Sequence, residues 1–433
     1  MVVTNSKYLK LRWINNVPNS WKIVAFQYIL DFSVGFTPPT NKSEFYDSDD
    51  YDWVTISDLN SKVIFETKNK LSQKGVDNSG KLPVKKGSLL YSFKLSIGKV
   101  AFAGKDLYTN EAILAIVPKY DRCLGYLYYM LPIILEQNAN INIYGAKIFN
   151  QEVINSSLIP VPPIQTQARI AEFLNKKTSE IDTIILKKEQ MLLSLEEKKK
   201  TIIDETATKG LNPSASMKDS GIEWIGEIPE HWEVKPLGYL GSCQNGVSKG
   251  GDYFGEGYPF VSYGDIYKNY ELPTQIEGLA KSSEEDREAY SVLYGDVFFT
   301  RTSETIEEIG IASTCLKTIE NAVFSGFTIR FRPYNLKELY PEYSKYFFRS
   351  NYIRVSLVKE MNIVTRASLS QTLLKSLKVI LPSYEDQKNI VLYFEKQFQI
   401  IDEAKEKISN QIDKLKEYRQ SLISEAVTGK IDI

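Results

Sequence analysis

Apolar residues recur every seven positions in two long stretches of the chain. Between Ile164 and Thr208 there is neither proline nor glycine. The recurring column there is Leu174, Ile181, Lys188, Leu195 and Ile202, with Ile170, Ile184 and Met191 in a column four residues earlier. The corresponding column near the end of the chain is Phe394, Ile401, Ile408, Leu415 and Leu422. A heptad column makes a narrow apolar seam, so we predict two long helices that pair with each other.

The remaining segments alternate apolar and polar residues over short runs bounded by Gly, Asp or Pro, which is typical of β-strands and turns. Such runs are WVTISDL from Trp53, AILAIVP ending at Pro118, FVSYGDI from Phe260 and FTIRFRP ending at Pro333. The segments YLYYMLPIIL and YSKYFFRSNYIRVSLV are predicted to be helical. A mixed α/β domain of roughly 150 residues therefore precedes each long helix.

The two halves of the chain repeat one another. WINNVPNSW from Trp13 and WIGEIPEHW from Trp224 lie at an offset of 211 residues, whereas PPIQTQARIAEFL from Pro162 and PSYEDQKNIVLYF from Pro382 lie at an offset of 220. The polar run GLNPSASMKDSG joins the copies, because its Gly and Pro residues end a helix. We expect an α+β tandem duplication with an antiparallel coiled coil, divided at residues 1–155, 156–210, 211–222, 223–376 and 377–433.

Composition agrees with this organisation. The chain has 433 residues, of which 43% are hydrophobic, enough for two or three folded domains. Neither a signal peptide nor a run long enough to span a membrane is recognisable, so we expect a cytoplasmic protein. The cysteines Cys123, Cys243 and Cys315 are far apart, and His231 is the single histidine, so neither a zinc site nor a histidine-based catalytic triad is expected.

The formal net charge of −1 conceals two basic stretches. In the first, from residue 60 to 105, ten lysines face only Glu66 and Asp77. The second contains Arg330, Arg332, Lys337, Lys345, Arg349, Arg354, Lys359, Arg366, Lys375 and Lys378. Clustered cations suit a phosphate-binding surface. The alternative is an ordinary solvated face.

The sequence WIGEIPEHWEVKPL opens a domain that ends in a P-x-x-x-x-Q segment and a long helix, and the first half has the same order. This arrangement resembles the specificity subunit of type I restriction-modification systems over essentially the whole chain. The resemblance implies two target-recognition domains that each read one half of a bipartite double-stranded DNA target, with the helices as spacer. It also implies two modification subunits and two restriction (translocase-nuclease) subunits as partners, which would hold S-adenosylmethionine, ATP and Mg.

Motifs for catalysis are missing from the chain itself. We find no Asn/Asp-Pro-Pro-Tyr/Phe motif, no Gly-rich turn for S-adenosylmethionine and no phosphate loop for ATP. We therefore expect a non-catalytic subunit without a cofactor or metal. A coiled-coil adaptor with two protein-binding domains is an alternative. A self-sufficient methyltransferase or nuclease is another, although the EDQK at Glu385 is better placed to cap the helix.

Two corresponding loops carry the expected DNA contacts. YSFKLSIGK from Tyr91 and FTRTSETIEEIG from Phe299 resemble the family's G-D-I-L-x-S-R-T-G loop, although the first has Phe93-Lys94 in place of an Arg-Thr pair. The candidates are Lys94, Lys99, Arg301, Thr302 and Ser303, with Lys147 and Arg366 near the following helices. We expect the W-I-x-x-[VI]-P-x-x-W segments to pack at the domain openings. Because the two copies differ in charge placement, we expect two unlike half-sites separated by a gap that the helices fix.

Overall fold

The computed structural model describes residues 14, 17–94, 96–119, 121–141, 147–223, 225–302, 305, 308–360 and 368–433. Trp13, Trp224, Ser303 and Arg366 lie outside these residues. The chain divides into two compact units. Unit 1 comprises residues 1–188 and 410–433, and unit 2 comprises residues 189–409.

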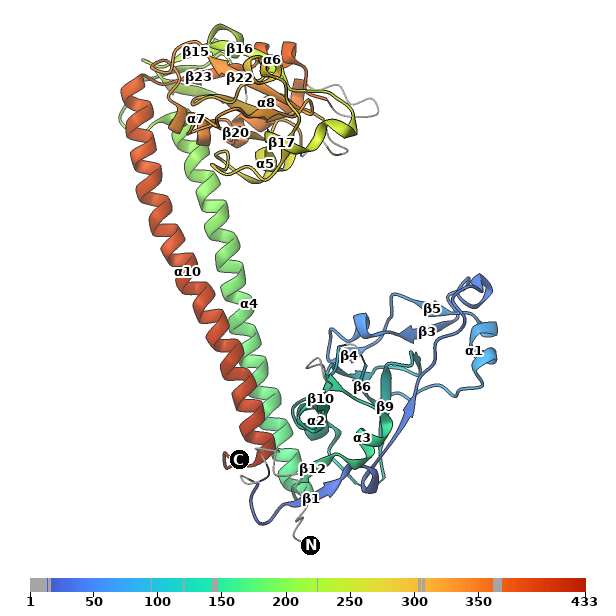
Figure 1. Ribbon diagram of the computed structural model, residues 1–433. Helices are drawn as coiled ribbons and strands as arrows, with labels where there is room; N and C mark the ends of the chain where they lie inside the picture. Colours follow the sequence, from blue (N-terminus) through green and yellow to red (C-terminus); the bar gives the residue numbers. More distant parts are fainter. Residues whose placement is uncertain are drawn as a thin grey trace. The chain divides into compact units, whose positions relative to one another are not determined.

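Unit 1 contains a five-stranded sheet of order β2-β9-β6-β7-β4 and a three-stranded sheet of order β5-β3-β8 (Figure 1). Their strands are β2 (Leu30–Val34), β9 (Ile113–Pro118), β6 (Leu89–Ser92), β7 (Val100–Ala103), β4 (Val63–Ile64), β5 (Lys70–Leu71), β3 (Tyr51–Val54) and β8 (Tyr108–Thr109). The other pairs are β1 (Lys22–Ala25) with β12 (Leu158–Val161), and β10 (Asn140–Ile141) with β11 (Lys147–Ile148). The shorter α-helices are α1 (Gln73–Ser79), α2 (Leu124–Asn138) and α3 (Gln151–Ser156).

Unit 2 contains a four-stranded sheet of order β16-β22-β19-β20 and a three-stranded sheet of order β18-β17-β21. Their strands are β16 (Gly241–Asn245), β22 (Thr328–Pro333), β19 (Val297–Thr300), β20 (Ala312–Thr314), β18 (Leu279–Ala280), β17 (Phe254–Val261) and β21 (Val323–Phe324). The other pairs are β15 (Glu233–Pro236) with β23 (Lys378–Leu381), and β13 (Met217–Asp219) with β14 (Glu227–Pro229). The shorter α-helices are α5 (Tyr263–Lys268), α6 (Glu284–Ala289), α7 (Pro341–Phe347), α8 (Asn351–Glu360) and α9 (Gln371–Ser376).

Short 3-10 helices connect several of these elements. They are η3 (Phe26–Tyr28), η4 (Ser43–Phe45) and η5 (Ile56–Asp58) in unit 1, and η6 (Leu237–Tyr239) and η7 (Gly251–Tyr253) in unit 2. The segment predicted as one helix from YSKYFF onward is two helices, because α7 ends at Phe347 and α8 begins at Asn351.

The strand pairing repeats between the units, which confirms the predicted α+β tandem duplication. The sheet order β2-β9-β6-β7 in unit 1 corresponds to β16-β22-β19-β20 in unit 2, and all these neighbours are antiparallel. In the smaller sheets, β3 runs parallel to β8 just as β17 runs parallel to β21. The central strands β6 and β19 are fully buried, as their uninterrupted apolar sequences require.

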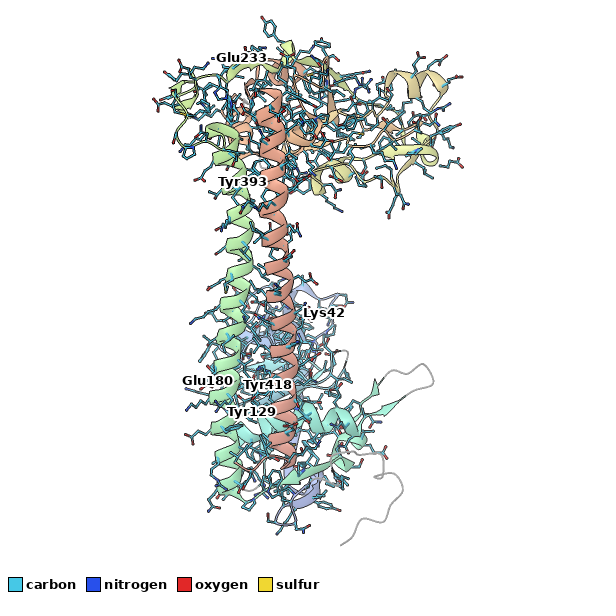
Figure 2. The ribbon with its side chains drawn as sticks, turned by 90° about the vertical axis from the view of Figure 1, so that its left-hand side faces the viewer. Lys42, Tyr129, Glu180, Glu233, Tyr393 and Tyr418 are labelled. Atoms are coloured by element: carbon cyan, nitrogen blue, oxygen red, sulfur yellow. The ribbon has the colours of Figure 1, made fainter. Side chains whose placement is uncertain are left out.

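The long helices are α4 (Ile164–Lys209) and α10 (Tyr384–Thr428), which lie side by side in both units (Figures 1 and 2). In unit 1, Arg419 donates to Asp182 at 2.8 Å and Lys188 donates to Gln411 at 2.6 Å. In unit 2, Lys199 donates to Asp402 at 2.5 Å. As the residue number rises in α4 it falls in α10, so the helices are antiparallel.

Two of these ion pairs are repeat equivalents. Asp182 and Asp402 differ by the 220-residue offset of the helix sequences, and so do Lys199 and Arg419. Each copy of the helix therefore supplies one acid and one base, and each finds its partner on the other helix within a unit. Exposed pairs of this kind contribute little to stability, about 0.2–1 kcal/mol.

The predicted seam residues differ in burial. Leu174, Ile181, Ile202, Phe394, Ile401, Ile408 and Leu422 are buried. Leu195 and Leu415 are half-buried. Lys188, in the same column, is half-buried and bonds to Gln411. The column expected four residues earlier is wrong beyond Ile170, because Ile184 and Met191 are 43% and 51% exposed.

The second row of the seam in α4 lies instead four residues after the first. It consists of Thr178, Ile185, Leu192, Lys199 and Thr206, all buried or half-buried. A column four residues earlier and a column four residues later both alternate steps of four and three with the first column, so the heptad spacing allows either. Burial separates the two, because Ile185 is 9% exposed whereas Ile184 is 43% exposed. Ile184 and Met191 lie on the flank of the seam.

Each long helix begins with a buried glutamine. In unit 1, Gln167 donates to the Pro162 carbonyl at 2.9 Å and accepts from the Cys123 amide at 3.1 Å. In unit 2, Gln387 donates to the Pro382 carbonyl at 2.9 Å and accepts from the Tyr340 amide at 2.8 Å. Each side chain thus ties the first turn of the long helix to the segment just before α2 or α7. This is the physical basis of the P-x-x-x-x-Q segment.

The helix ends explain the repeated tryptophan segments. Gly210 follows α4 with a positive φ of 72°, and a Cβ there would lie 3.1 Å from the ring of Trp232. Gly429 follows α10 with a φ of 75° and faces Pro18 and Trp21 in the same way. The second tryptophan of each segment therefore covers the glycine that ends a long helix.

Trp232 is held by a polar contact as well. Its indole N–H donates to Asp386 at 3.0 Å, and His231 lies 2.9 Å from the same carboxylate. Burial raises the pKa of Asp386, but its hydrogen bonds with His231, Ser383 and Trp232 outweigh that effect and lower the pKa overall. The cap of α10 is Ser383, whose hydroxyl accepts from the Asp386 amide, while Glu385 pairs with Lys388 in the first turn.

Candidate nucleic-acid interface

A buried hydroxyl closes the neck of the same loop in both units. In unit 1, Ser92 at the end of β6 donates to the Ser96 carbonyl at 2.5 Å and accepts from the Lys99 amide at 2.9 Å. In unit 2, Thr300 at the end of β19 donates to the Glu308 carbonyl at 2.6 Å and accepts from the Ile311 amide at 2.9 Å. The loops 93–99 and 301–311 thus leave their sheets through the same clamp.

A four-residue turn precedes the neighbouring strand in each unit. In unit 1 it is residues 110–113, in which the Ala112 amide donates to the Asn110 side chain at 3.1 Å. In unit 2 it is residues 325–328, in which the Phe327 amide donates to the Ser325 hydroxyl at 3.2 Å. Side-chain oxygens that accept from the backbone two residues on are the hallmark of Asx and Ser turns.

Backbone hydrogen bonds join the loop to the turn. The Phe93 amide donates to the Ala112 carbonyl at 3.0 Å in unit 1, and the Arg301 amide donates to the Phe327 carbonyl at 2.9 Å in unit 2. Phe93 therefore corresponds to Arg301, and Ala112 corresponds to Phe327. This correspondence comes from the hydrogen bonds and does not depend on an alignment of the loop sequences.

A third segment reaches the same end of each sheet. Gly35 follows β2 and Gly246 follows β16, and both sit where the chain passes directly over the strand before the turn. A Cβ at Gly35 would overlap the carbonyl oxygens of Thr109 and Asn110, and one at Gly246 would overlap those of Phe324 and Ser325. Only glycine allows this approach. We call this end of each sheet, where loop, turn and glycine segment meet, the reading edge.

The structure brings some of the predicted contacts together at the reading edges. In unit 1, Lys94 and Lys99 are exposed on one loop, and the Lys99 ammonium lies 3.3 Å from the Ile56 carbonyl. In unit 2, Arg301 and Thr302 are half-buried, and the Arg301 guanidinium lies 3.4 Å from the Gly326 carbonyl. Thr302 bridges to Ser368 in the segment that follows α8.

Three further predicted contacts cannot be located by their side chains in the part of the chain that the structure describes. Lys147 begins β11, and only its backbone is described. Ser303 and Arg366 lie outside the described residues.

Sequence reasoning missed two exposed side chains at the reading edges. Phe327 is 66% exposed in unit 2. Glu111 is exposed in unit 1 and accepts a hydrogen bond from Thr37. Neither position stands out in the sequence, because the turn that presents it is recognised only once Asn110 and Ser325 are seen to play the same role.

Four of the ten lysines in the first basic stretch are paired with acids outside it. Lys105 lies 2.5 Å from Asp52, which Lys70 also approaches at 3.8 Å. Lys85 lies 2.7 Å from Asp106 and Lys74 lies 3.2 Å from Glu44. The expectation that this whole stretch faces a phosphate backbone was therefore too broad. The salt bridges of the described residues include none for the other six lysines, Lys62, Lys68, Lys81, Lys86, Lys94 and Lys99, of which Lys62 donates to Asn175.

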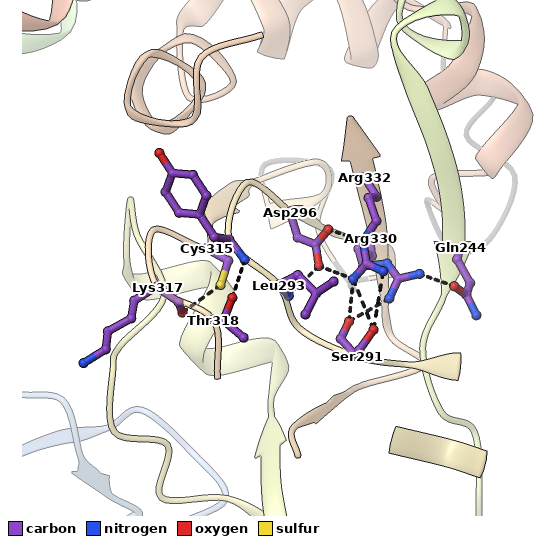
Figure 3. Close-up of polar contacts among 10 residues, drawn as sticks. Gln244, Ser291, Leu293, Asp296, Cys315, Lys317, Thr318, Arg330 and Arg332 are labelled. Carbon is purple, nitrogen blue, oxygen red and sulfur yellow. Dashed lines mark hydrogen bonds and ion pairs between the residues drawn. The ribbon is translucent and has the colours of Figure 1, made fainter. Parts of the chain in front are cut away.

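Several cations of the second basic stretch bind groups within the fold. Arg332 forms a two-point ion pair with Asp296, which is 1% exposed, and also bonds to Ser291 (Figure 3). The Arg330 side chain, 5% exposed, bonds to Gln244 and the Ser291 carbonyl. Burial lowers the pKa of Arg330 to about 10, so it remains a cation at neutral pH. These arginines hold β22 against β16 and the segment before β19, so their hydrogen-bonding groups are used within the fold.

Arg349 and Lys345 also serve the fold. Arg349 donates to the carbonyls of Ala312, Ile266, Tyr267 and Asn269, and Lys345 pairs with Glu271 at 3.0 Å. Burial lowers the pKa of Arg349. Four of the ten cations of the second basic stretch therefore fasten parts of the fold to one another, and the phosphate-surface interpretation is wrong for these four residues. Lys337, Lys359, Lys375 and Lys378 are exposed.

The cysteines are free thiols, and burial raises the pKa of Cys243 to about 11 and that of Cys315 to about 12. Both remain protonated at neutral pH and unreactive as nucleophiles. Within the described part of the chain, no group of three or more His, Cys, Asp or Glu residues is arranged to hold a metal ion. In the same residues, no helix combines the length and the apolar character needed to cross a membrane.

Comparison with known proteins identifies relatives of the whole chain. The EcoKI type I restriction enzyme specificity subunit of Escherichia coli K12 is 26% identical over 302 residues, which are 68% of this chain and 61% of that subunit. The match spans less than two thirds of that relative. The putative MjaX specificity subunit of Methanocaldococcus jannaschii is 27% identical over 97% of this chain and 96% of the relative.

Two solved structures share the fold. A chain from a study of complex assembly and conformational transition in a type I R-M system has a TM-score of 0.68 at 16% identity, covering 96% of this chain and 99% of that one. The HsdS subunit from Thermoanaerobacter tengcongensis has a TM-score of 0.52 at 16% identity, with 96% and 98% covered.

The family described as type I restriction modification DNA specificity domain matches residues 18–193 and again residues 229–414. These two segments are the two copies of the duplication, each with its reading edge and most of its long helix. Because they account for most of its length, the chain belongs to the family of type I restriction modification DNA specificity domains.

Proposed function

We propose that this chain reads a bipartite DNA target, one half with each copy of the duplicated domain. The observation that carries the proposal is the reading edge. Both units build it from the same hydroxyl clamp, turn and glycine crossing, yet expose different side chains on it. A constant scaffold with variable tips is how a recognition module changes its target without changing its fold.

The DNA contacts that we propose are those expected from the sequence. Lys94, Lys99 and Lys147 would serve the first half-site, and Arg301, Thr302, Ser303 and Arg366 the second. The exposed lysines suit phosphates, and Arg301 suits the acceptor edge of a guanine. The exposed fraction of Lys94 and Lys99 supports this assignment.

The chain itself would be non-catalytic and cytoplasmic, and its partners would perform the chemistry. By analogy with the relatives, it would recruit two modification subunits, which hold S-adenosylmethionine, and two restriction subunits, which use ATP and Mg. The proposed division is residues 1–155 and 223–376 for target recognition, 156–210 and 377–433 for the helices, and 211–222 for the linker. The flanks of the helices would receive the modification subunits.

The test is methylation sequencing of single DNA molecules from a methylation-free bacterial host. The host expresses a cognate modification subunit with or without this chain. Methylated adenines in a split motif, seen only when the chain is present, would establish the function and give both half-sites. If the complex assembles and no methylation appears, the DNA-reading proposal fails for this pairing.

The other candidate function, a coiled-coil adaptor with two protein-binding domains, predicts a different result. Such an adaptor would leave the methylation pattern unchanged and would still bind its protein partners. The difference in exposed side chains between two equivalent edges favours reading of two unlike half-sites.

A further inference from the structure

We propose that Phe327 makes an apolar contact with a base of the second half-site and is a specificity-determining residue there. In the first domain no such contact is made, and polar side chains read the corresponding bases. The inference rests on the proposed function. It adds a residue that the sequence motifs do not indicate, and it assigns a chemical character to each half-site.

The position of the ring is fixed by the turn that carries it. The Thr328 amide donates to the Ser325 carbonyl at 3.0 Å, and the Thr328 hydroxyl donates to the same oxygen at 2.6 Å. The Gly326 amide donates to the Val247 carbonyl at 2.7 Å. Ser325 and Thr328 are buried, whereas Phe327 between them is 66% exposed. A rigid turn that displays a large apolar ring is preorganised to contact a partner.

The equivalent turn in unit 1 shows that the fold does not require an exposed side chain at the position of Phe327. Residues 110–113 make the same side-chain-capped turn, but Ala112, at the position of Phe327, is 4% exposed. Phe93, at the position of Arg301, is 3% exposed. In unit 1 both positions are therefore apolar and buried. In unit 2 the same two positions carry Arg301 and Phe327 at the edge.

The surroundings of Phe327 favour a base over a phosphate. Arg301 lies beside it through the bond from its amide to the Phe327 carbonyl. Ser248, exposed on the glycine segment, is the other near neighbour of the turn. In the sequence, the loop that begins at Arg301 continues with Glu304, Glu307 and Glu308. Such a loop is a poor general phosphate surface, whereas Arg, Ser and an aromatic ring are suited to base edges.

The chemistry open to the ring is contact with a thymine methyl group or with the face of an unstacked base. In the first domain, the exposed groups at the edge include Glu111, Thr37, Lys94 and Lys99. A carboxylate there can accept from the amino group of cytosine. The two half-sites should therefore differ in chemical character, one with an apolar contact and the other without.

The experiment uses the complex of the full chain with its modification subunit and the target defined by methylation sequencing. Binding of a duplex containing both half-sites is measured for the wild-type chain, Phe327→Ala and Tyr334→Ala. Tyr334 is the matched control, because it is 71% exposed just beyond the other end of the same strand, β22. We expect Phe327→Ala to weaken binding on the order of tenfold and Tyr334→Ala to leave it unchanged.

A second set of duplexes locates the contact. Thymines of each half-site are replaced one at a time by deoxyuracil, which lacks the methyl group. A loss that occurs in the second half-site and disappears in Phe327→Ala identifies a methyl contact. If no deoxyuracil matters but Phe327→Ala still loses affinity and tolerates changed bases at one position, the ring contacts a base face. Both outcomes support the proposal.

Equal binding and an unchanged methylation motif for Phe327→Ala and Tyr334→Ala would overturn it. So would relaxation of the first half-site by Phe327→Ala. If the wild-type complex neither binds nor methylates DNA, the proposed function itself has failed, and that result is distinct because it does not depend on any variant. Thermal unfolding of both variants checks that the fold is intact.

Discussion

Trp232 shows how a single side chain can join two long helices. Its ring covers Gly210 at the end of α4, and its indole N–H reaches Asp386 in the first turn of α10. Trp21 covers Gly429 in the same way, but position 166, which corresponds to Asp386, is a threonine. The repeated segment therefore has one shared packing role, and one copy adds a titratable contact.

That contact predicts an acid sensitivity. The folded-state pKa of Asp386 is lowered, so its contribution to stability is present above its unfolded pKa and is lost as the pH falls through the lower folded value. The pH range in which this contribution is lost therefore lies below about 4. The free energy of unfolding, measured with denaturant between neutral pH and about pH 2.5, should fall less steeply with acid in Asp386→Asn than in the wild type. If the free energy of unfolding falls equally with pH in the wild type and in Asp386→Asn, the Asp386 carboxylate does not cause the acid sensitivity.

The buried glutamines give a second prediction. Gln387→Leu removes the acceptor of the Tyr340 amide and the donor to the Pro382 carbonyl. Leaving these groups unpaired in the interior should cost about 1–3 kcal/mol of unfolding free energy. Gln399→Leu is the control on the same helix, because its side chain is exposed and bonds to Glu403. Equal stability of the two variants would contradict this account of the P-x-x-x-x-Q segment.

Among the elements, the long helices were the most predictable. Each helix is more than forty residues long, and its heptad column has five positions, from Leu174 to Ile202 in α4 and from Phe394 to Leu422 in α10, so the period is clear. The second row of the seam was placed on the wrong side of the first, because Ile184 and Met191 are as apolar as Ile185 and Leu192. Hydrophobicity alone does not distinguish the two flanks of a seam, whereas the antiparallel partner does.

Ile185 and Ile184 test the corrected seam side by side. Ile185 is 9% exposed and Ile184 is 43% exposed on the same turn of α4. Ile185→Ala should destabilise unit 1 by about 2–5 kcal/mol, the usual cost for a buried isoleucine. Ile184→Ala should change the free energy of unfolding by less than about 0.5 kcal/mol. If denaturant unfolding showed that Ile184→Ala loses more stability than Ile185→Ala, the column predicted from the sequence would be the correct one.

The strands and loops were predictable in kind but not in detail. AILAIVP and FTIRFRP became β9 and β22, and the loops after Tyr91 and Phe299 indeed leave equivalent strands. The basic stretches misled, because lysine and arginine look the same in a sequence whether Asp52 or Asp296 lies opposite or not. Phe327 was overlooked because its exposure depends on a turn set by Ser325 and Val247.

For the whole molecule, the chain ends deserve a test. Pro18 and Trp21 pack in unit 1 against Gly429, so a segment near the start of the described residues meets the residue that ends α10. A chain that begins at Ser214, with the old ends joined by a short flexible linker, should fold and direct the same methylation. A chain cut within β22 should not fold, because that strand is central to its sheet. Equal failure of both variants would count against the packing described here.

The spacer role predicts a change in the target gap alone. Seven residues inserted after Lys188 and seven after Ser409 preserve the heptad columns and lengthen each helix by roughly 10 Å. The gap between the two half-sites should widen by about three base pairs, because successive base pairs are about 3.4 Å apart along the DNA axis. The sequences of both half-sites should stay the same. Methylation sequencing reads both quantities. A change in the bases recognised would refute the spacer role of the helices.

The hydroxyl clamp has an evolutionary consequence. Ser92 and Thr300 close loops of different length, 93–99 and 301–311, with the same pair of hydrogen bonds. Lengthening a loop beyond a closed neck costs little entropy, because that cost grows only with the logarithm of its length. Insertions and substitutions in the loop that the clamp closes can therefore accumulate while each successive variant remains folded. A lineage carrying this device can acquire new targets in small viable steps, and a loop graft in the laboratory should follow the same route.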